Sequence, residues 1–175
     1  KRSLVYRPIQ IDGRRSLFIE DDVYIAQYAW LMGNKKRDEA LRIKSGTTLG
    51  HYAHIVAIES IVIENNVLIA DNVFISDCTH SYENIGVPVI RQDVKILSSV
   101  IIGEGSWLGE NVCVCGASIG KHCVIGANSV VTTEIPDYCV AVGSPARVVK
   151  KYDFEKNEWK KAESYDSNID WRSRS

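Results

Sequence analysis

The residues most able to take part in a chemical reaction lie together at Asp77-Cys78-Thr79-His80. The imidazole of His80, whose ordinary pKa is about 6.5, can take a proton from an attacking hydroxyl near neutral pH. Asp77 or Glu83 could orient the ring, because a catalytic base usually has a partner that fixes it. Cys78 lies two positions before His80, so both would face one side of a strand. This leaves two interpretations of Cys78: a nucleophile that forms an acyl-enzyme, or a small residue at a corner.

The other three histidines, His51, His54 and His122, fall on positions that do not point inward in the repeat described below, which favours solvent or subunit contacts. A metal-dependent carbonic anhydrase would need three histidines converging on zinc. His51 and His54 are close in sequence, and no third ligand stands at a matching position, so we predict no metal site. The five cysteines form no CxxC pair, which disfavours a zinc site or disulfide framework and favours a reducing cytoplasm.

An aliphatic residue recurs every six positions along much of the chain, most clearly from Ile102 to Ile135. On an α-helix, six residues turn the chain by about 600°, which would scatter these side chains around the cylinder. On an extended chain, even spacings face the same side, and a chain of this length must bend at each repeat. The period therefore predicts an all-β solenoid with inward aliphatic side chains. We assign the bends to the small residues after the aliphatics, such as Gly103, Gly109, Gly120 and Gly126.

The positions of the repeats predict about five coils. Residues 1–18 are expected to form an N-terminal cap, and the charged segment 33–39 a loop. A long inserted loop is expected at about 80–99, and long loops inside a compact solenoid are usually functional. We assign residues 1–150 to one domain and 151–175 to a C-terminal extension, partly disordered. Within it, Tyr152, Phe154 and Trp159 are expected to fold back as a short extended piece.

Composition narrows the class of protein. The chain has 175 residues, is 45% hydrophobic and 25% charged, and carries a net charge of −1. This balance indicates one soluble globular domain and disfavours a general nucleic-acid or membrane-surface binder. No apolar run approaches the roughly 20 residues that a membrane helix needs, so we predict no integral membrane segment.

Several motifs are more specific than the repeat itself. The chain carries Asn66-Val67-Leu68-Ile69-Ala70, Asp77-Cys78-Thr79-His80, Ser106-Trp107-Leu108-Gly109, Ile125-Gly126-Ala127-Asn128-Ser129 and Gly143-Ser144-Pro145-Ala146-Arg147. With these motifs the chain resembles the hexapeptide-repeat acyltransferases, in the branch of sugar and polysaccharide O-acetyltransferases, from about residue 17 to 155. The resemblance implies a left-handed parallel β-helix, a homotrimer, and three active sites between neighbouring subunits.

The same resemblance implies roles for individual residues. His80 would be the catalytic base for direct transfer from acetyl-CoA as co-substrate. Trp107 would line the cleft for the pantetheine arm and the acceptor, although a Trp at a trimer contact is the alternative. Ala70 and Ala127 match positions whose small side chains let the backbone bond the pantetheine amides.

Basic residues just past the last coil are the remaining candidates for binding the cofactor. Arg147 and Lys150 could pair with the CoA phosphates, the alternative being a solvated basic tail. In the galactoside branch, an Asn that helps to hold the acceptor stands near the position of Gly50, and this chain has Gly50-His51 there.

The expected function is an O-acetyltransferase that moves an acetyl group to a sugar hydroxyl, in surface polysaccharide or lipopolysaccharide biosynthesis. The expected acceptor is a carbohydrate or nucleotide sugar. Three alternatives remain: an acyltransferase to an amino-sugar nitrogen or to serine, a carbonic-anhydrase-like protein, and an inactive trimeric scaffold.

Overall fold

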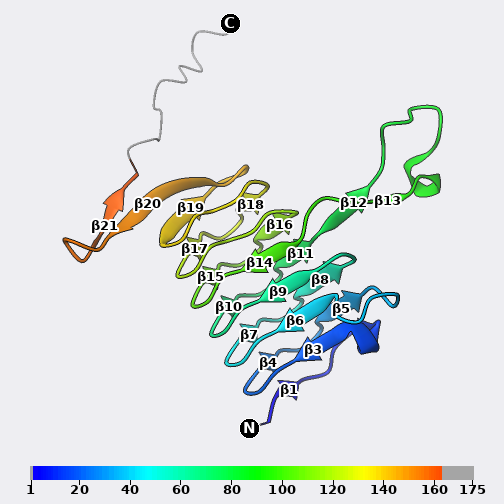
Figure 1. Cartoon of the computed structure of the whole chain (residues 1–175), viewed down its shortest axis with the longest axis horizontal. Helices are drawn as coiled ribbons and strands as arrows, with labels where there is room; N and C mark the ends of the chain where they lie inside the picture. The colour runs from blue at the N-terminus through cyan, green and yellow to red at the C-terminus, as the bar shows by residue number, and fades with distance from the viewer. Residues whose placement is uncertain (1, 163–175) are drawn as a thin grey trace, which may run out of the picture.

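The computed structural model describes residues 2–162, and these wind into a prism with three flat sides (Figure 1). Each side is a sheet of short parallel strands, which successive coils contribute one at a time. On the third side, the last coils contribute only the isolated bridges Ile102–Ile119 and Ile119–Ile135. Strands of successive coils pair in register, as Leu68 pairs with Trp107 and Trp107 with Val124. Side chains at one position of the repeat therefore form straight rows along the prism.

The three sides are named here sheets A, B and C. Sheet A contains the parallel strands β1 (Leu4–Val5), β4 (Tyr24–Ile25), β7 (Thr48–Leu49), β10 (Leu68–Ile69), β15 (Trp107–Leu108), β17 (Val124–Ile125) and β19 (Cys139–Val142). Sheet B contains β2 (Gln10–Asp12), β5 (Trp30–Gly33), β8 (His54–Ala57), β11 (Phe74–Ser76), β16 (Cys113–Cys115) and β18 (Val130–Val131). Sheet C contains β3 (Leu17–Ile19), β6 (Leu41–Ile43), β9 (Ile61–Ile63) and β14 (Val100–Ile102).

The number of coils is larger than the repeat predicted. Sheet A has seven parallel strands, so the solenoid has about seven turns rather than about five. One extra turn lies at the N-terminus, where β1 and β2 already pair with β4 and β5, and a short 3₁₀ helix η1 (Arg14–Ser16) follows them. The cap expected at residues 1–18 thus contributes strands to two sheets. The six-residue repeats of this N-terminal turn are irregular, so the turn was not recognised from the spacing of aliphatic residues.

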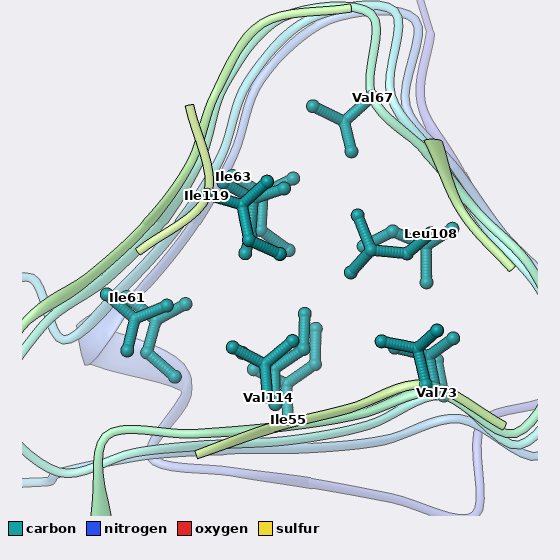
Figure 2. Packing of buried hydrophobic residues seen from close by; sticks show 14 of the residues in the cluster. Ile55, Ile61, Ile63, Val67, Val73, Leu108, Val114 and Ile119 are labelled. Carbon is teal, nitrogen blue, oxygen red and sulfur yellow. The ribbon is translucent and has the colours of Figure 1, made fainter. Parts of the chain in front are cut away.

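The coil is left-handed, as the resemblance implied and spacing alone could not show. Figure 2 looks along the prism, with the yellow-green later coils in front of the blue earlier ones. The chain runs from Ile55 through Ile61 and Val67 to Val73, which is clockwise in this view. A clockwise path that advances toward the viewer is a left-handed turn. The solenoid is therefore an exception to the right-handed rule for parallel crossovers.

The core is the set of inward aliphatic side chains that the hexads predicted, stacked in rows (Figure 2). Ile69, Ile75 and Leu108 are at most 1% exposed. Burying such a side chain contributes about 1.5–3 kcal/mol, so the rows stabilise each coil against the next.

The glycines after the aliphatics do not make the bends, which corrects that part of the sequence reading. The corners turn instead at left-handed residues, of which asparagine is the most frequent type: Asn66, Asn72, Asn111 and Asn128 have φ of 57–60°. Asparagine tolerates this region better than most residues. Gly103 and Gly109 are needed for close approach, because a Cβ would lie 2.4 Å from the backbone of Gly120 or 2.8 Å from that of Ala127.

Two segments leave the prism. The first is an arm between β11 and β14, which contains β12 (Cys78–His80), β13 (Val94–Ile96) and the 3₁₀ helix η2 (Val89–Arg91). Figure 1 shows it projecting from the prism in green, where the inserted loop at 80–99 was predicted. The second is the antiparallel pair β20 (Arg147–Asp153) and β21 (Glu158–Lys161), which folds back on β19 and brings Tyr152 and Trp159 together. The end of the predicted C-terminal extension, from residue 163, lies outside the described residues.

Candidate functional site

The arm places His80 by ordinary β pairing. Strands β12 and β13 are antiparallel, and His80 lies opposite Val94. The base of the arm is tied to the prism where Leu97 N–H donates to the Asp77 carbonyl at 2.8 Å and Ser98 Oγ donates to the Gly116 carbonyl at 2.7 Å. His80 thus stands on a short paired strand, which positions a side chain better than an open loop would.

His80 lies at a cavity between the arm and the outer face of sheet B. The cavity has a volume of about 510 Å³. The residues around His80 are mostly apolar: Met32, Val56, Ile58, Phe74, Val94 and Leu97, with His54, Ser76, Cys78, Thr79 and Cys115 between them. A concave apolar site with few polar groups is the usual form of a small-molecule site.

Asp77 does not orient His80, although it lies three residues away. Its side chain is fully buried, and its carboxylate accepts hydrogen bonds from the backbone N–H groups of Ile58, Glu59 and Ser60 at 2.7–3.0 Å. It therefore fixes a corner of the preceding coil, at the root of the arm. This role of Asp77 could not be predicted from the sequence, because residues 58–60 are distant from Asp77 along the chain.

Glu83 also has another partner. It forms an ion pair with Lys95 on β13 at 2.6 Å, and this hydrogen bond, helped by nearby backbone N–H groups, lowers the pKa of Glu83 to about 2. Neither Glu83 nor Asp77 is hydrogen-bonded to His80 within residues 2–162. The expected support for the base from these two carboxylates is therefore wrong for the single chain.

Cys78 is a weak candidate for a nucleophile. Burial raises the pKa of its thiol, and its sulfur lies 3.4 Å from the Ser76 hydroxyl. The thiolate is the nucleophilic form, and a raised pKa makes it rarer at neutral pH. The geometry thus favours the interpretation of Cys78 as a packed small residue.

The residues assigned to the cofactor lie on sheet A. Trp107 is 49% exposed on the outer face. Its row continues through Val124 and Val140 to Lys150, which pairs with Val140 on the antiparallel strand β20 beside a bulge at Val140/Ala141. Adjacent strands are about 4.8 Å apart, so Trp107 and Lys150 stand about 14 Å apart on one face.

The other predicted cofactor residues flank this row. Arg147, at the start of β20, is exposed, and one of its guanidinium nitrogens donates to the Ala146 carbonyl at 2.8 Å. Ala70 follows β10, and Ala127 follows β17 at the same edge of sheet A. Ala127 is exposed and Ala70 partly so, which leaves this edge of the sheet open to a ligand.

One chain does not bring His80 and Trp107 together. The arm leaves the prism between sheets B and C, whereas Trp107 lies on sheet A. In a three-sided prism the corner between two sides is opposite the third side, so the packed core separates the two residues.

His54 lies in the candidate site, although the sequence predicted only solvent or subunit contacts for it. It lines the His80 cavity, and its ring stacks on Trp30 at 4.4 Å and meets Phe74 edge-on at 5.1 Å. Its Nε2 is buried without a hydrogen-bond partner within the described residues, and burial lowers its pKa. A sequence feature could have identified His54: Trp30, His54 and Phe74 place aromatic rings at the same position of three successive coils.

The lowered pKa of His54 predicts a pH dependence of stability. The unfolded chain binds this proton more readily than the folded protein does, so stability is complete above about pH 6.5 and declines as the pH falls below it. We expect the melting temperature to drop between pH 7 and pH 5. In His54→Phe, which keeps a ring in the stack, the drop should be smaller, and an equal drop in both proteins would contradict the assignment.

The remaining histidines lie apart from the cavity. The His51 ring lies 3.2 Å from Asp71, and His122 stacks on Tyr138 at 5.5 Å. Within residues 2–162, no three His, Cys, Asp or Glu side chains are grouped closely enough to hold a metal ion. In the same part of the chain, no helix is long and apolar enough to cross a membrane.

Comparison with known proteins agrees with the repeat. A family model described as the hexapeptide repeat of succinyl-transferase matches residues 99–133. WbbJ of Escherichia coli strain K12, named as a lipopolysaccharide biosynthesis O-acetyl transferase, is 46% identical over 118 residues, which are 63% of this chain. The chain spans 60% of the length of that relative.

Two further matches cover more of the chain. The galactoside O-acetyltransferase of Escherichia coli strain K12 is 29% identical over 93% of this chain and 80% of its own. The crystal structure of AntD, an N-acyltransferase from Bacillus cereus in complex with dTDP and 3-hydroxybutyryl-CoA, superposes with a TM-score of 0.71. That match covers 86% of this chain and 79% of the other at 18% identity, and it shows the fold alone. The hexads and the left-handed solenoid they form show the hexapeptide-repeat fold, and these relatives show that the chain is similar to hexapeptide-repeat acetyltransferases.

Proposed function

We propose that the protein transfers an acetyl group from acetyl-CoA to a hydroxyl of a carbohydrate, with His80 as the general base. The observation that carries the proposal is the imidazole of His80, held on a paired strand at the mouth of an apolar cavity of about 510 Å³. The names of the two Escherichia coli relatives support sugar O-acetylation, and WbbJ in particular supports a role in lipopolysaccharide or other surface polysaccharide assembly. The acceptor is then a carbohydrate or a nucleotide sugar.

In this reaction His80 has to transfer one proton. An imidazole nitrogen takes the proton of the acceptor hydroxyl as its oxygen attacks the thioester carbonyl. The new C–O ester bond forms, the C–S bond breaks, and the proton held by the imidazole is returned to the departing sulfur. The cavity wall beside His80 is mostly apolar, and since His80 is exposed on the single chain, exclusion of competing water would depend on the bound substrates and the neighbouring chain.

The outer face of sheet A suits the cofactor. A pantetheine arm is an extended chain, and the span of about 14 Å from Trp107 to Lys150 is of the right order for it. Lys150 and Arg147 are cations at the far end of that face, where charge-assisted bonds to phosphates would form. Ala70 and Ala127 leave the adjoining backbone accessible.

A homotrimer would complete the site. Because the core of one prism separates His80 from Trp107, we place the reaction between the arm of one chain and sheet A of its neighbour. The arm carries strongly exposed apolar side chains, among them Ile85 and Ile90, which a neighbouring chain would cover. Three such contacts would close a ring and give three equivalent sites. The five free cysteines agree with a reducing cytoplasm.

Acceptor-dependent release of CoA tests the proposal. We expect thiol release from acetyl-CoA, followed with a thiol reagent, to require a sugar and to yield an O-acetylated product by mass spectrometry. A panel of oligosaccharides and nucleotide sugars would identify the acceptor. Release that needs no acceptor would indicate simple hydrolysis of the thioester and contradict acetyl transfer. Product found only on amino groups would contradict O-acetylation and favour the N-acyltransferase alternative, for which the AntD fold is the precedent.

Trp107 gives a second test, directed at the cofactor face. We expect Trp107→Ala to raise the KM for acetyl-CoA about tenfold or more, because a large exposed ring that covers the ligand is lost. Leu68→Ala, one strand away in the same exposed row, removes apolar surface at a position to which we assign no contact. Its KM should stay near that of the wild type, and an equal rise in both variants would show that the row serves a general surface role.

A further inference from the structure

Two cysteines stand side by side on the outer face of sheet B. Cys113 and Cys115 flank Val114 on β16, and Val114 points into the core with no exposed surface. Alternation therefore turns both cysteines outward, where each is half-buried. Their sulfur atoms lie 3.4 Å apart, and neither is assigned a role in acetyl transfer.

This geometry disfavours a disulfide. A disulfide needs Cβ atoms about 3.5–4.5 Å apart. Residues two apart on a strand are separated by about 6.6 Å, because each residue advances the chain by about 3.3 Å. The two thiols converge through their side-chain rotamers, and a direct S–S bond would require the strand to buckle.

One bridging atom, in contrast, fits the existing distance. Soft thiol ligands prefer soft, thiophilic centres. Two bonds of about 2.3 Å from one centre, meeting at nearly a right angle, span about 3.3 Å between the sulfur atoms. A pyramidal trivalent arsenic has this angle, whereas a linear centre would need the sulfur atoms more than 4 Å apart.

We propose that Cys113 and Cys115 form a dithiol site for thiophilic trivalent centres, with trivalent arsenicals as the ligand class. Phenylarsine oxide is the probe. Its As=O oxygen leaves as water with the two thiol protons, two As–S bonds form, and arsenic stays trivalent, so no oxidant is needed. Burial and the neighbouring thiol raise the pKa of Cys113, which slows its reaction with simple alkylating agents.

The other cysteines provide matched controls. Cys78 lies in the wall of the same cavity as Cys115, but its sulfur contacts the Ser76 hydroxyl at 3.4 Å rather than another thiol. Cys123 and Cys139 are each about 1% exposed, inside the prism. Among residues 2–162, Cys113 and Cys115 are thus the accessible thiols whose sulfur atoms are in contact, and the Cys78→Ser variant tests whether Cys78 takes part.

Intact-mass measurement tests the site without any assay of activity. We expect one phenylarsenic adduct per folded chain, removed by dimercaptopropanol but not by excess 2-mercaptoethanol. Cys113→Ser and Cys115→Ser should each bind about 100-fold more weakly, because the second bond is no longer intramolecular. Cys78→Ser and Cys139→Ser should bind like the wild type. No adduct on the folded wild type, or undiminished binding by either Cys113→Ser or Cys115→Ser, would overturn the proposal.

Diamide oxidation tests the geometric argument directly. We expect no Cys113–Cys115 disulfide in peptide maps of the oxidised folded protein. Rapid formation of that disulfide would show that the strand buckles readily, and the preference for a bridging centre would be overturned.

A second consequence rests on the proposed function. Cys115 lines the His80 cavity, so the phenyl group of the adduct would occupy space beside the imidazole. We expect phenylarsine oxide to inhibit acetyl transfer by the wild type and to leave Cys113→Ser insensitive. Uptake measured by mass without inhibition would overturn this consequence and leave the dithiol site standing, so the two failures are distinguishable.

Discussion

Replacing His80 by alanine is expected to lower kcat for acetyl transfer by about 10²–10⁴-fold, the usual contribution of a general base. The KM for acetyl-CoA should change little, since we place the cofactor on sheet A of the neighbouring chain. His80 is exposed and belongs to no core row, so the melting temperature should stay near that of the wild type. The measurements are steady-state kinetics with acetyl-CoA and the acceptor, together with thermal unfolding.

Two control variants separate the base from other effects. His122→Ala removes an imidazole at another corner of the prism, where it stacks on Tyr138, and should keep full activity. Cys78→Ser removes the thiol beside the base and should keep most of the activity if transfer is direct. A His80→Ala enzyme within tenfold of the wild type would reject His80 as the base. A Cys78→Ser enzyme as inactive as His80→Ala would instead restore the acyl-enzyme hypothesis.

Replacing Asp77 by alanine is expected to destabilise the fold by about 3 kcal/mol or more. The change leaves three backbone N–H groups, those of Ile58, Glu59 and Ser60, without the acceptor that they now share. These donors are part-buried, and an N–H group left unpaired costs up to about 1–3 kcal/mol. Urea unfolding measures the free energy, and activity should fall as well, because Asp77 stands at the root of the arm.

Graded substitutions make this prediction sharper. Asp77→Asn keeps one acceptor oxygen and should lose about half as much stability as Asp77→Ala. Asp38→Ala removes a carboxylate of equal charge from an exposed loop and should change the free energy of unfolding by less than about 0.5 kcal/mol. Equal losses for Asp38→Ala and Asp77→Ala would mean that net charge, rather than the anchored corner, determines stability.

The hexads predicted the parts of the fold that depend on local rules. Inward positions such as Ile69 and Leu108 and the outward position of Trp107 follow from strand alternation. The position of the arm follows from the break in the six-residue period at about residue 80. The irregular first coil carries a weaker pattern, which is why the number of turns was underestimated.

Polar partners and contacts across the prism required the tertiary structure. Asp77 and Glu83 are near His80 in sequence, yet the first bonds a corner of the preceding coil and the second bonds Lys95. The Cys113–Cys115 contact depends on the side-chain rotamers that bring the two sulfur atoms together, which alternation alone does not give.

The sequence by itself therefore determined which side of each strand faces the core, because a period of six and an alternation of two act over neighbouring residues. Only the tertiary structure decided which charged and titratable groups meet. Coils stack residues that are about 16–19 or more positions apart, and hydrogen-bond geometry then selects among several nearby candidates.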